Sequence, residues 1–177
     1  MRILGFLTFF FAGAAFAAPL PATTSSKLIS ERPGLFRSHT GFQIDSGKTG
    51  WKQVMAPGQN GFIATVYRSN EPVDGIQPAL TVRMDKLEKK TSLSRYTKRW
   101  MKDYPRLGFE ILTAKKVKVG QGVGFMLDLI NRDNEMQLRQ LLFLKNKDVV
   151  NLTCRDHHEN FNNTLKSCNE IFRTFRW

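Results

Sequence analysis

The hydrophobic pattern is most regular near the C-terminus, where apolar residues recur at steps of four and three. Because about 3.6 residues make one helical turn, this spacing predicts a helix with a single apolar face. The apolar positions are Phe161, Leu165, Cys168, Phe172 and Phe175, and Ile171 widens the face. Asp156 and Glu159 stand three residues apart just before this pattern, and we expect them to form a capping pair at the helix start.

The segment before this helix, residues 149–154, is rich in β-branched residues and alternates between two faces, as a strand does. Val150, Leu152 and Cys154 share one face, so Cys154 and Cys168 each lie on the face that their own element would bury. A helix packed back on this strand would bring the two sulfur atoms together. We predict a Cys154–Cys168 disulfide that closes a loop of about 15 residues. Two buried free thiols are the alternative.

Shorter alternating segments precede this region and are separated by glycine, proline and asparagine. The predicted strands are residues 41–45, 51–54, 61–68, 79–84, 109–119, 123–129 and 135–145. Ser92 can cap a second amphipathic helix that ends near Pro105 and Gly108. Its buried face is expected to hold Leu93, Tyr96, Trp100, Tyr104 and Leu107. Strands joined by short turns pair antiparallel, so the class is α+β, with a middle helix and a C-terminal helix on one sheet of about six or seven strands.

The N-terminus has the features of a signal peptide over residues 1–17. Arg2 gives a positive start, an apolar run too short to cross a bilayer comfortably follows, and Ala15-Phe16-Ala17 fits the small-x-small cleavage rule. An uncleaved anchor is the alternative. Residues 18–37 are expected to be a flexible lead-in, and residues 38–177 a single domain. The mature chain is therefore expected in the periplasm or outside the cell, where a disulfide persists.

The order of these segments is similar to the PsbP-like fold family, which also contains the Ran-binding nuclear import adaptor. A hairpin with a tryptophan after its turn (GFQIDSGKTGWKQV) comes first, and a strand followed by an amphipathic helix (LTVRM, SLSRYTKRWMKDY) comes next. A glycine-rich entry to a meander (GQGVGFMLDL, MQLRQLLFL, DVVNLTC) and a phenylalanine-rich final helix (NEIFRTFRW) complete it. The resemblance covers roughly residues 38–177. It implies an α/β/α sandwich around an antiparallel sheet and a non-enzymatic role as an adaptor or assembly factor.

Charge is concentrated in the middle of the chain. The formal net charge is +12, and loss of residues 1–17 removes only Arg2, which leaves +11. Residues 83–118 alone carry 12 basic and four acidic residues. On the middle helix, the side opposite the aromatic residues is almost wholly basic, with Arg95, Lys98, Arg99, Lys102 and Arg106 as candidate binding residues for an anion or partner. A solvated face that keeps the protein soluble is the simpler interpretation, and a docking face for an anionic partner is the sharper one.

No residue pattern in the chain indicates catalysis, a metal or a cofactor. Adjacent helical residues diverge by about 100°, so His157 and His158 cannot form a ligand face by themselves. No serine stands in a Gly-x-Ser-x-Gly elbow, and the two cysteines are assigned to a disulfide. We therefore expect a non-enzymatic binding or assembly module that acts on another envelope or secreted protein. An anionic lipid or glycan surface is the alternative partner, nucleic acid is disfavoured by compartment, and the sequence sets no oligomeric state.

Overall fold

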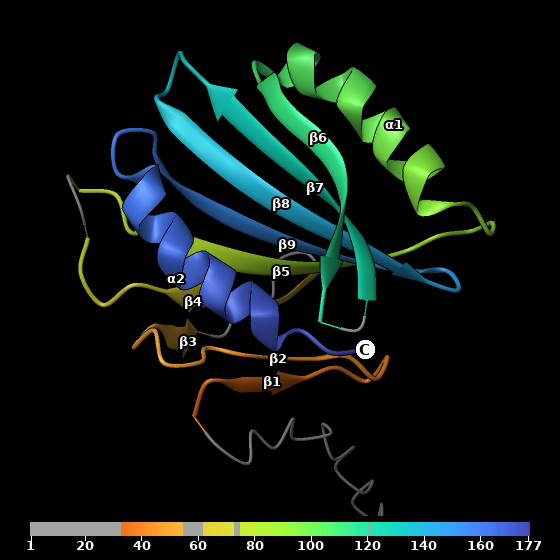
Figure 1. The fold of residues 1–177 in the computed structure, drawn as a ribbon, viewed down its shortest axis with the longest axis horizontal. Coiled ribbons are helices and arrows are strands. Elements are labelled where there is room, and N and C mark those ends of the chain that lie inside the picture. The colour runs from red at the N-terminus through yellow and green to blue at the C-terminus, as the bar shows by residue number, and fades with distance from the viewer. Residues whose placement is uncertain (1–32, 55–61, 73–74, 121) are drawn as a thin grey trace, which may run out of the picture.

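A seven-stranded antiparallel sheet forms the centre of the fold, in the order β3-β4-β5-β9-β8-β7-β6 (Figure 1). The computed structural model describes residues 33–54, 62–72, 75–120 and 122–177. The predicted signal peptide and most of the predicted lead-in lie outside these residues. The strands of this sheet are β3 (Lys52–Val54), β4 (Ile63–Arg68), β5 (Ala79–Lys86), β6 (Glu110–Val119), β7 (Gly122–Asn131), β8 (Met136–Lys145) and β9 (Asp148–His157).

Two helices complete an α/β/α arrangement, because they pack on opposite faces of this sheet. Helix α1 (Leu93–Asp103) continues into a short 3-10 helix, η1 (Tyr104–Leu107), and helix α2 (Phe161–Thr174) follows β9. Successive side chains of a strand point to opposite faces. On β8, Leu142 belongs to the hydrophobic cluster under α1, whereas its neighbours Leu141 and Phe143 belong to the cluster under α2. The α+β class predicted from the sequence is confirmed.

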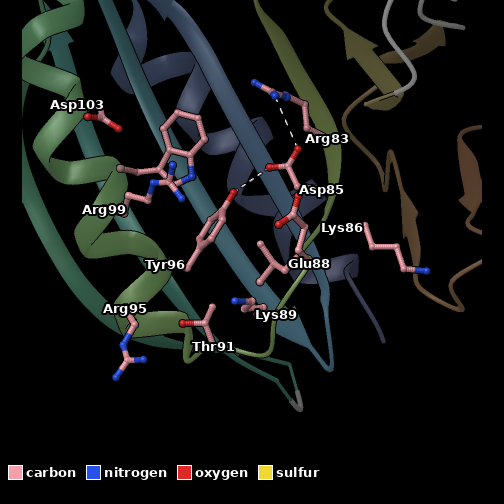
Figure 2. Close-up of a pocket in the computed structure, with 12 residues that line it drawn as sticks. Arg83, Asp85, Lys86, Glu88, Lys89, Thr91, Arg95, Tyr96, Arg99 and Asp103 are labelled. Atoms are coloured by element: carbon pink, nitrogen blue, oxygen red, sulfur yellow. Dashed lines mark hydrogen bonds and ion pairs between the residues drawn. The ribbon is translucent and has the colours of Figure 1, made fainter.

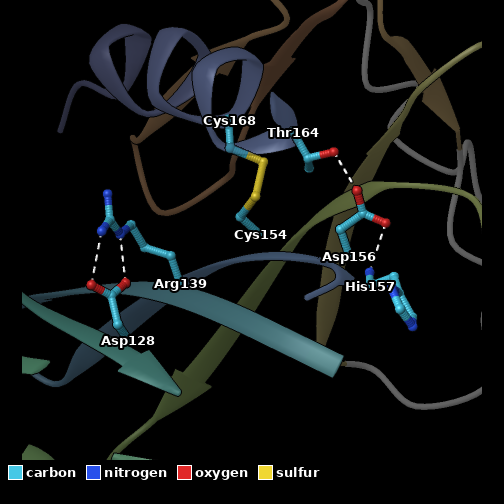
Figure 3. The surroundings of a disulfide bond; sticks show 7 residues. All are labelled: Asp128, Arg139, Cys154, Asp156, His157, Thr164 and Cys168. Atoms are coloured by element: carbon cyan, nitrogen blue, oxygen red, sulfur yellow. Dashed lines mark hydrogen bonds and ion pairs between the residues drawn. A yellow bond between two sulfur atoms is a disulfide. The ribbon is translucent and has the colours of Figure 1, made fainter. Parts of the chain in front are cut away.

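The disulfide fixes α2 against the middle of the sheet, as Figure 3 shows. The sulfur atoms of Cys154 on β9 and Cys168 on α2 lie 2.08 Å apart, at bonding distance, and both residues are fully buried. Around them, Leu152, Ile171 and Phe172 fill the space between helix and sheet. The two apolar faces predicted from the periodicity are therefore the two faces that meet here.

The N-terminal part of the domain begins earlier than the sequence suggested. Leu35–Arg37, which were assigned to the flexible lead-in, form strand β1, and Leu35 and Phe36 are buried. Strand β1 pairs antiparallel with β2 (Gln43–Asp45) in a separate two-stranded sheet. The expected hairpin between residues 41–45 and 51–54 is therefore wrong, because β2 pairs with β1 whereas β3 pairs with β4. Alternation identifies a strand but does not identify its partner.

Two smaller expectations about the helices also fail. The N-cap of α2 is Asn160, whose side chain makes no capping bond, so Asp156 and Glu159 do not cap the helix. Asp156 is instead a fully buried residue of β9 that accepts a hydrogen bond from the hydroxyl of Thr164 (Figure 3). Leu107 is 58% exposed, because the chain tightens into η1 after α1 and turns this residue away from the core. Ser92 caps α1 as predicted and accepts a hydrogen bond from the amide of Arg95.

The disulfide is expected to contribute strongly to stability. Cys154 and Cys168 are 14 residues apart, and the chain-entropy estimate for a loop of this size is about 3 kcal/mol. The double variant Cys154→Ala/Cys168→Ala should therefore lose about 3 kcal/mol or more of unfolding free energy, measured by urea denaturation of the mature chain. A loss below about 1 kcal/mol would contradict this account.

A close approach of two strands leaves little room for a side chain at Gly124, and Gly122, two residues earlier, provides a matched control. A Cβ atom at Gly124 would lie 2.9 Å from Cε1 of Phe143, whereas one at Gly122 would lie 3.8 Å from the same ring. Gly124→Ala should lower the unfolding free energy by about 1–3 kcal/mol, because the buried Phe143 must move. Gly122→Ala should change it by less than about 0.5 kcal/mol. Equal effects of the two substitutions in thermal or urea unfolding would refute the packing argument.

Candidate functional site

A groove of about 720 Å³ lies between α1 and strand β5 of the sheet (Figure 2). It exists because α1 packs on β7 and β8 and leaves the same face of β5 uncovered. Leu80 and Val82 of β5 point into the core under α2, so the alternate residues Arg83 and Asp85 point to the α1 side. The chain between β5 and α1 closes one end of this groove.

Three segments supply the groove lining. Strand β5 contributes Arg83, Asp85 and Lys86; the connection contributes Leu87, Glu88, Lys89 and Thr91; and α1 contributes Arg95, Tyr96, Arg99, Trp100 and Asp103. The connection is held in place from the neighbouring turn, because Lys147 donates a hydrogen bond to the backbone carbonyl of Glu88 and its own carbonyl accepts one from Leu87. The groove therefore has a fixed end and two aromatic residues along the helix.

Asp85, one of the three acidic residues that line the groove, is already engaged. Tyr96 donates a hydrogen bond of 2.8 Å to Asp85, and a guanidinium nitrogen of Arg83 lies 3.8 Å from the other carboxylate oxygen (Figure 2). Asp85 therefore offsets Arg83 and orients the ring of Tyr96. In the part of the chain that the structure describes, no ion pair joins Lys86, Lys89, Arg95 or Arg99 to an acidic side chain. Lys89, Arg95 and Arg99 are available to an anionic ligand, whereas the side chain of Lys86 points away from the groove (Figure 2).

The structure divides the five basic residues that the sequence grouped together. All five are exposed, but only Arg95 and Arg99 line the groove. Lys98, Lys102 and Arg106 lie outside it, and these three exposed residues of α1 and η1 define what we call the convex side of the helix. The contribution of β5 and of the connection was not predicted. The high charge of residues 83–118 included Arg83 and Lys89, but sequence alone did not show that they line the same groove as Arg95 and Arg99.

A chain of polar side chains runs under the end of α1, next to the groove. The hydroxyl of Tyr104 donates to Gln140, which donates to Thr153 at 3.3 Å, and Thr153 donates to Asn151 at 3.3 Å. Tyr104 and Gln140 are both buried. Since buried polar groups need partners, this network fixes the base of α1 on the sheet at a defined position.

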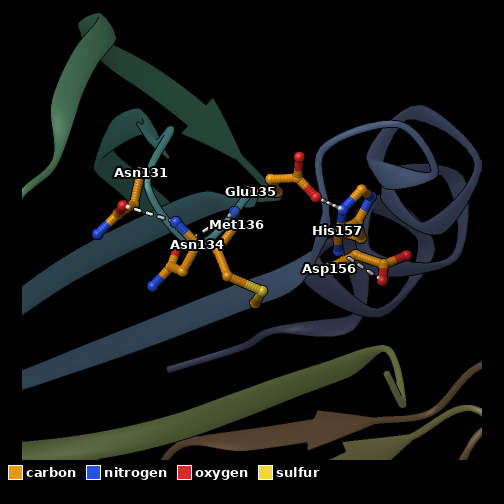
Figure 4. Close-up of polar contacts among 6 residues, drawn as sticks. All are labelled: Asn131, Asn134, Glu135, Met136, Asp156 and His157. Carbon is orange, nitrogen blue, oxygen red and sulfur yellow. Dashed lines mark hydrogen bonds and ion pairs between the residues drawn. The ribbon is translucent and has the colours of Figure 1, made fainter. Parts of the chain in front are cut away.

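The two adjacent histidines lie at the end of β9, away from the groove. Nε2 of His157 lies 2.7 Å from a carboxylate oxygen of Glu135 (Figure 4). The backbone amide of His158 donates a hydrogen bond to the backbone carbonyl of Glu135. The hydrogen bond from His157, and then its charge, lower the pKa of Glu135. Among residues 33–177, apart from those the structure leaves undescribed, no three His, Cys, Asp or Glu side chains are grouped to hold a metal ion. The contacts of His157 and His158 with Glu135 therefore connect the start of β8 to the chain that enters α2.

The solved structures most useful for comparison share this fold at low sequence identity. No protein-family model and no curated protein sequence matches the chain. Solved structures do match, and three of them are each aligned over 81% of this chain: cyanobacterial PsbP (CyanoP) from Synechocystis sp. PCC 6803, the protein of unknown function and putative regulator PA94 from Pseudomonas aeruginosa, and LpqN of Mycobacterium tuberculosis, which is involved in cell envelope biogenesis.

The fold of the chain is therefore PsbP-like, as the order of its segments indicated. CyanoP aligns with a TM-score of 0.59 and 15% identity over 91% of its own chain. PA94 aligns with a TM-score of 0.58 and 12% identity over 95% of its own chain. LpqN aligns with a TM-score of 0.61 and 10% identity over 89% of its own chain. Identities this low establish the shared fold and leave function to be argued from the surface. None of the described helices is both long and apolar enough to cross a membrane.

All three tyrosines of the chain are expected to resist ionisation while it is folded. Burial raises the pKa of Tyr104 from 10.0 to about 12. Burial also raises the pKa of Tyr67, and burial together with the hydrogen bond to Asp85 raises that of Tyr96. Spectrophotometric titration of the folded protein should show no tyrosinate step near the ordinary tyrosine pKa of 10.0, and the unfolded chain should ionise all three tyrosines there.

The sign of the linked stability change follows from these raised pKa values. The folded state holds the tyrosine protons more tightly than the unfolded state does, so the associated stability is complete below about pH 10. This part of the unfolding free energy should be lost as the pH rises from about 10 toward the folded-state pKa values of the tyrosines. A native protein that ionises even one tyrosine with an ordinary pKa would contradict the buried positions described here.

Proposed function

We propose that this chain is an exported, non-enzymatic binding or assembly module that docks an acidic segment of another envelope or secreted protein. The observation that carries the proposal is the groove beside α1, where unpaired cations line a concave surface together with Tyr96 and Trp100. Aromatic and arginine side chains are the residue types most enriched at protein interfaces. An extended acidic segment with apolar side chains matches both features.

Export rests on three supporting observations. The N-terminal sequence has the features of a signal peptide, a disulfide such as Cys154–Cys168 is typical of proteins in oxidising compartments, and one protein of the same fold, LpqN, is involved in cell envelope biogenesis. These observations support an envelope or secreted partner over a cytoplasmic one.

The second candidate function is binding to an anionic lipid or glycan surface. A specific observation favours it: Lys98, Lys102 and Arg106 are exposed on the convex side of the helix, outside the groove. A flat membrane would contact this convex side, whereas a polypeptide segment can enter the groove. The two candidates therefore use different residues of the same helix.

A pair of charge-reversal variants separates the two candidates. Arg95→Glu/Arg99→Glu changes the groove side, and Lys98→Glu/Lys102→Glu makes the same change of charge on the convex side. Protein capture from envelope extract should fall at least tenfold for the groove variant and less than about threefold for the convex variant. Both should bind vesicles containing anionic phosphatidylglycerol no better than the unaltered chain does.

The opposite result would identify a surface binder. If the unaltered chain binds the anionic vesicles, if the convex variant alone loses that binding, and if binding disappears at high salt, the lipid function replaces the docking function. Since all four side chains are exposed, circular dichroism should show that both variants remain folded.

A further inference from the structure

The sheet has one long open edge, which is formed by β6. The other edge strand, β3, is only three residues long, whereas β6 has ten. Among the described residues, β6 pairs only with β7, and its outer side carries no backbone hydrogen bond. An open edge presents unpaired amide and carbonyl groups, which are a template for another strand. Figure 1 shows β6 as the last strand of the sheet.

The accessible part of this edge is the regular segment 113–119. The pairing of β6 with β7 shifts between Ile111 and Thr113, where the irregularity leaves Leu112 45% exposed. Beyond it, the register is continuous to Val119, and no glycine or proline interrupts the segment. Bulges terminate or redirect pairing, so the open template begins after this point.

We propose that residues 113–119 of β6 bind an extended segment of a partner protein with alternating acidic and apolar residues, which adds one strand to the sheet. Main-chain hydrogen bonds supply affinity in this mode of recognition, and alternating side chains supply specificity. This surface lies outside the groove, so the inference does not depend on the function proposed above. A chain with both surfaces could hold two partners together.

The charges on this edge select the partner. Lys116 pairs with Phe125 and Lys118 with Val123, which places both lysines on the α1 side of the sheet. Val117 and Val119 lie on the α2 side, where they pack at the margin of the core. An added strand with acidic residues on the first side and apolar residues on the second would complement both. Opposite charges in neighbouring strands stabilise a sheet.

The same charges argue against a second copy of this chain as the occupant. Lys115, Lys116 and Lys118 are all exposed, and none forms an ion pair within the described residues. Two β6 strands paired edge to edge would bring lysines of one copy next to lysines of the other. Like charges in neighbouring strands are destabilising, so the edge repels its own copy and attracts an acidic strand.

The test uses a labelled peptide of alternating glutamate and valine, eight residues long, with binding to the mature chain measured by fluorescence anisotropy at pH 7. In an extended strand, the amide groups of alternate residues point to the same edge. One derivative carries N-methyl groups on all glutamates and the other on all valines, so each blocks a different edge of the peptide. The parent peptide should bind, and only one derivative should lose about tenfold or more in affinity.

A pair of protein variants locates the bound peptide. Lys116→Glu/Lys118→Glu should weaken binding about tenfold, whereas Lys98→Glu/Lys102→Glu, with the same change of charge on α1, should weaken it less than about threefold. The inference is overturned if the parent peptide does not bind, if the two methylated derivatives behave alike, or if the two protein variants do. Behaviour of the last two kinds would mean that the peptide is attracted by net charge or binds in the groove, and not at β6.

Discussion

The packing of α2 on β9 is the contact on which the rest of the structure depends. The Cys154–Cys168 disulfide joins the helix to the strand, and the apolar residues around it close one face of the sheet. The chain then leaves α2 so that Arg176 and Gln43 exchange backbone hydrogen bonds, which ties β2 to the C-terminus. Phe175 stacks on Phe143 at 4.3 Å between ring centroids, next to this connection. The position of β2, and of β1 paired with it, therefore depends on that of α2.

The opposite face of the sheet is less completely covered, and this difference creates the surfaces available for binding. Helix α1 packs over β7 and β8, and the network from Tyr104 through Gln140 fixes its base there. The uncovered face of β5 becomes one wall of a groove, and the edge strand β6 has no partner on its outer side among the described residues. Both surfaces carry exposed cations.

The sequence predicted those features that depend on local periodicity. The step of four and three from Phe161, the alternation around Cys154 and the Ser92 cap were enough to place both helices, most strands and the disulfide. It failed where the outcome depended on partners distant in sequence. Residues 41–45 alternate correctly, but nothing local shows that they pair with Leu35–Arg37 instead of residues 51–54. Likewise, the basic residues of α1 were recognised, but their division between groove and convex side depends on how the helix packs.

Site-specific photo-crosslinking in intact cells of the source organism would test the central claim, that the groove docks a protein, most directly. A photoreactive amino acid replaces Thr91, which lines the groove, or Lys98, which does not. The account predicts a discrete protein adduct from position 91 and none from position 98. An adduct from position 98 alone, adducts with lipid, or no adduct from position 91 would contradict it.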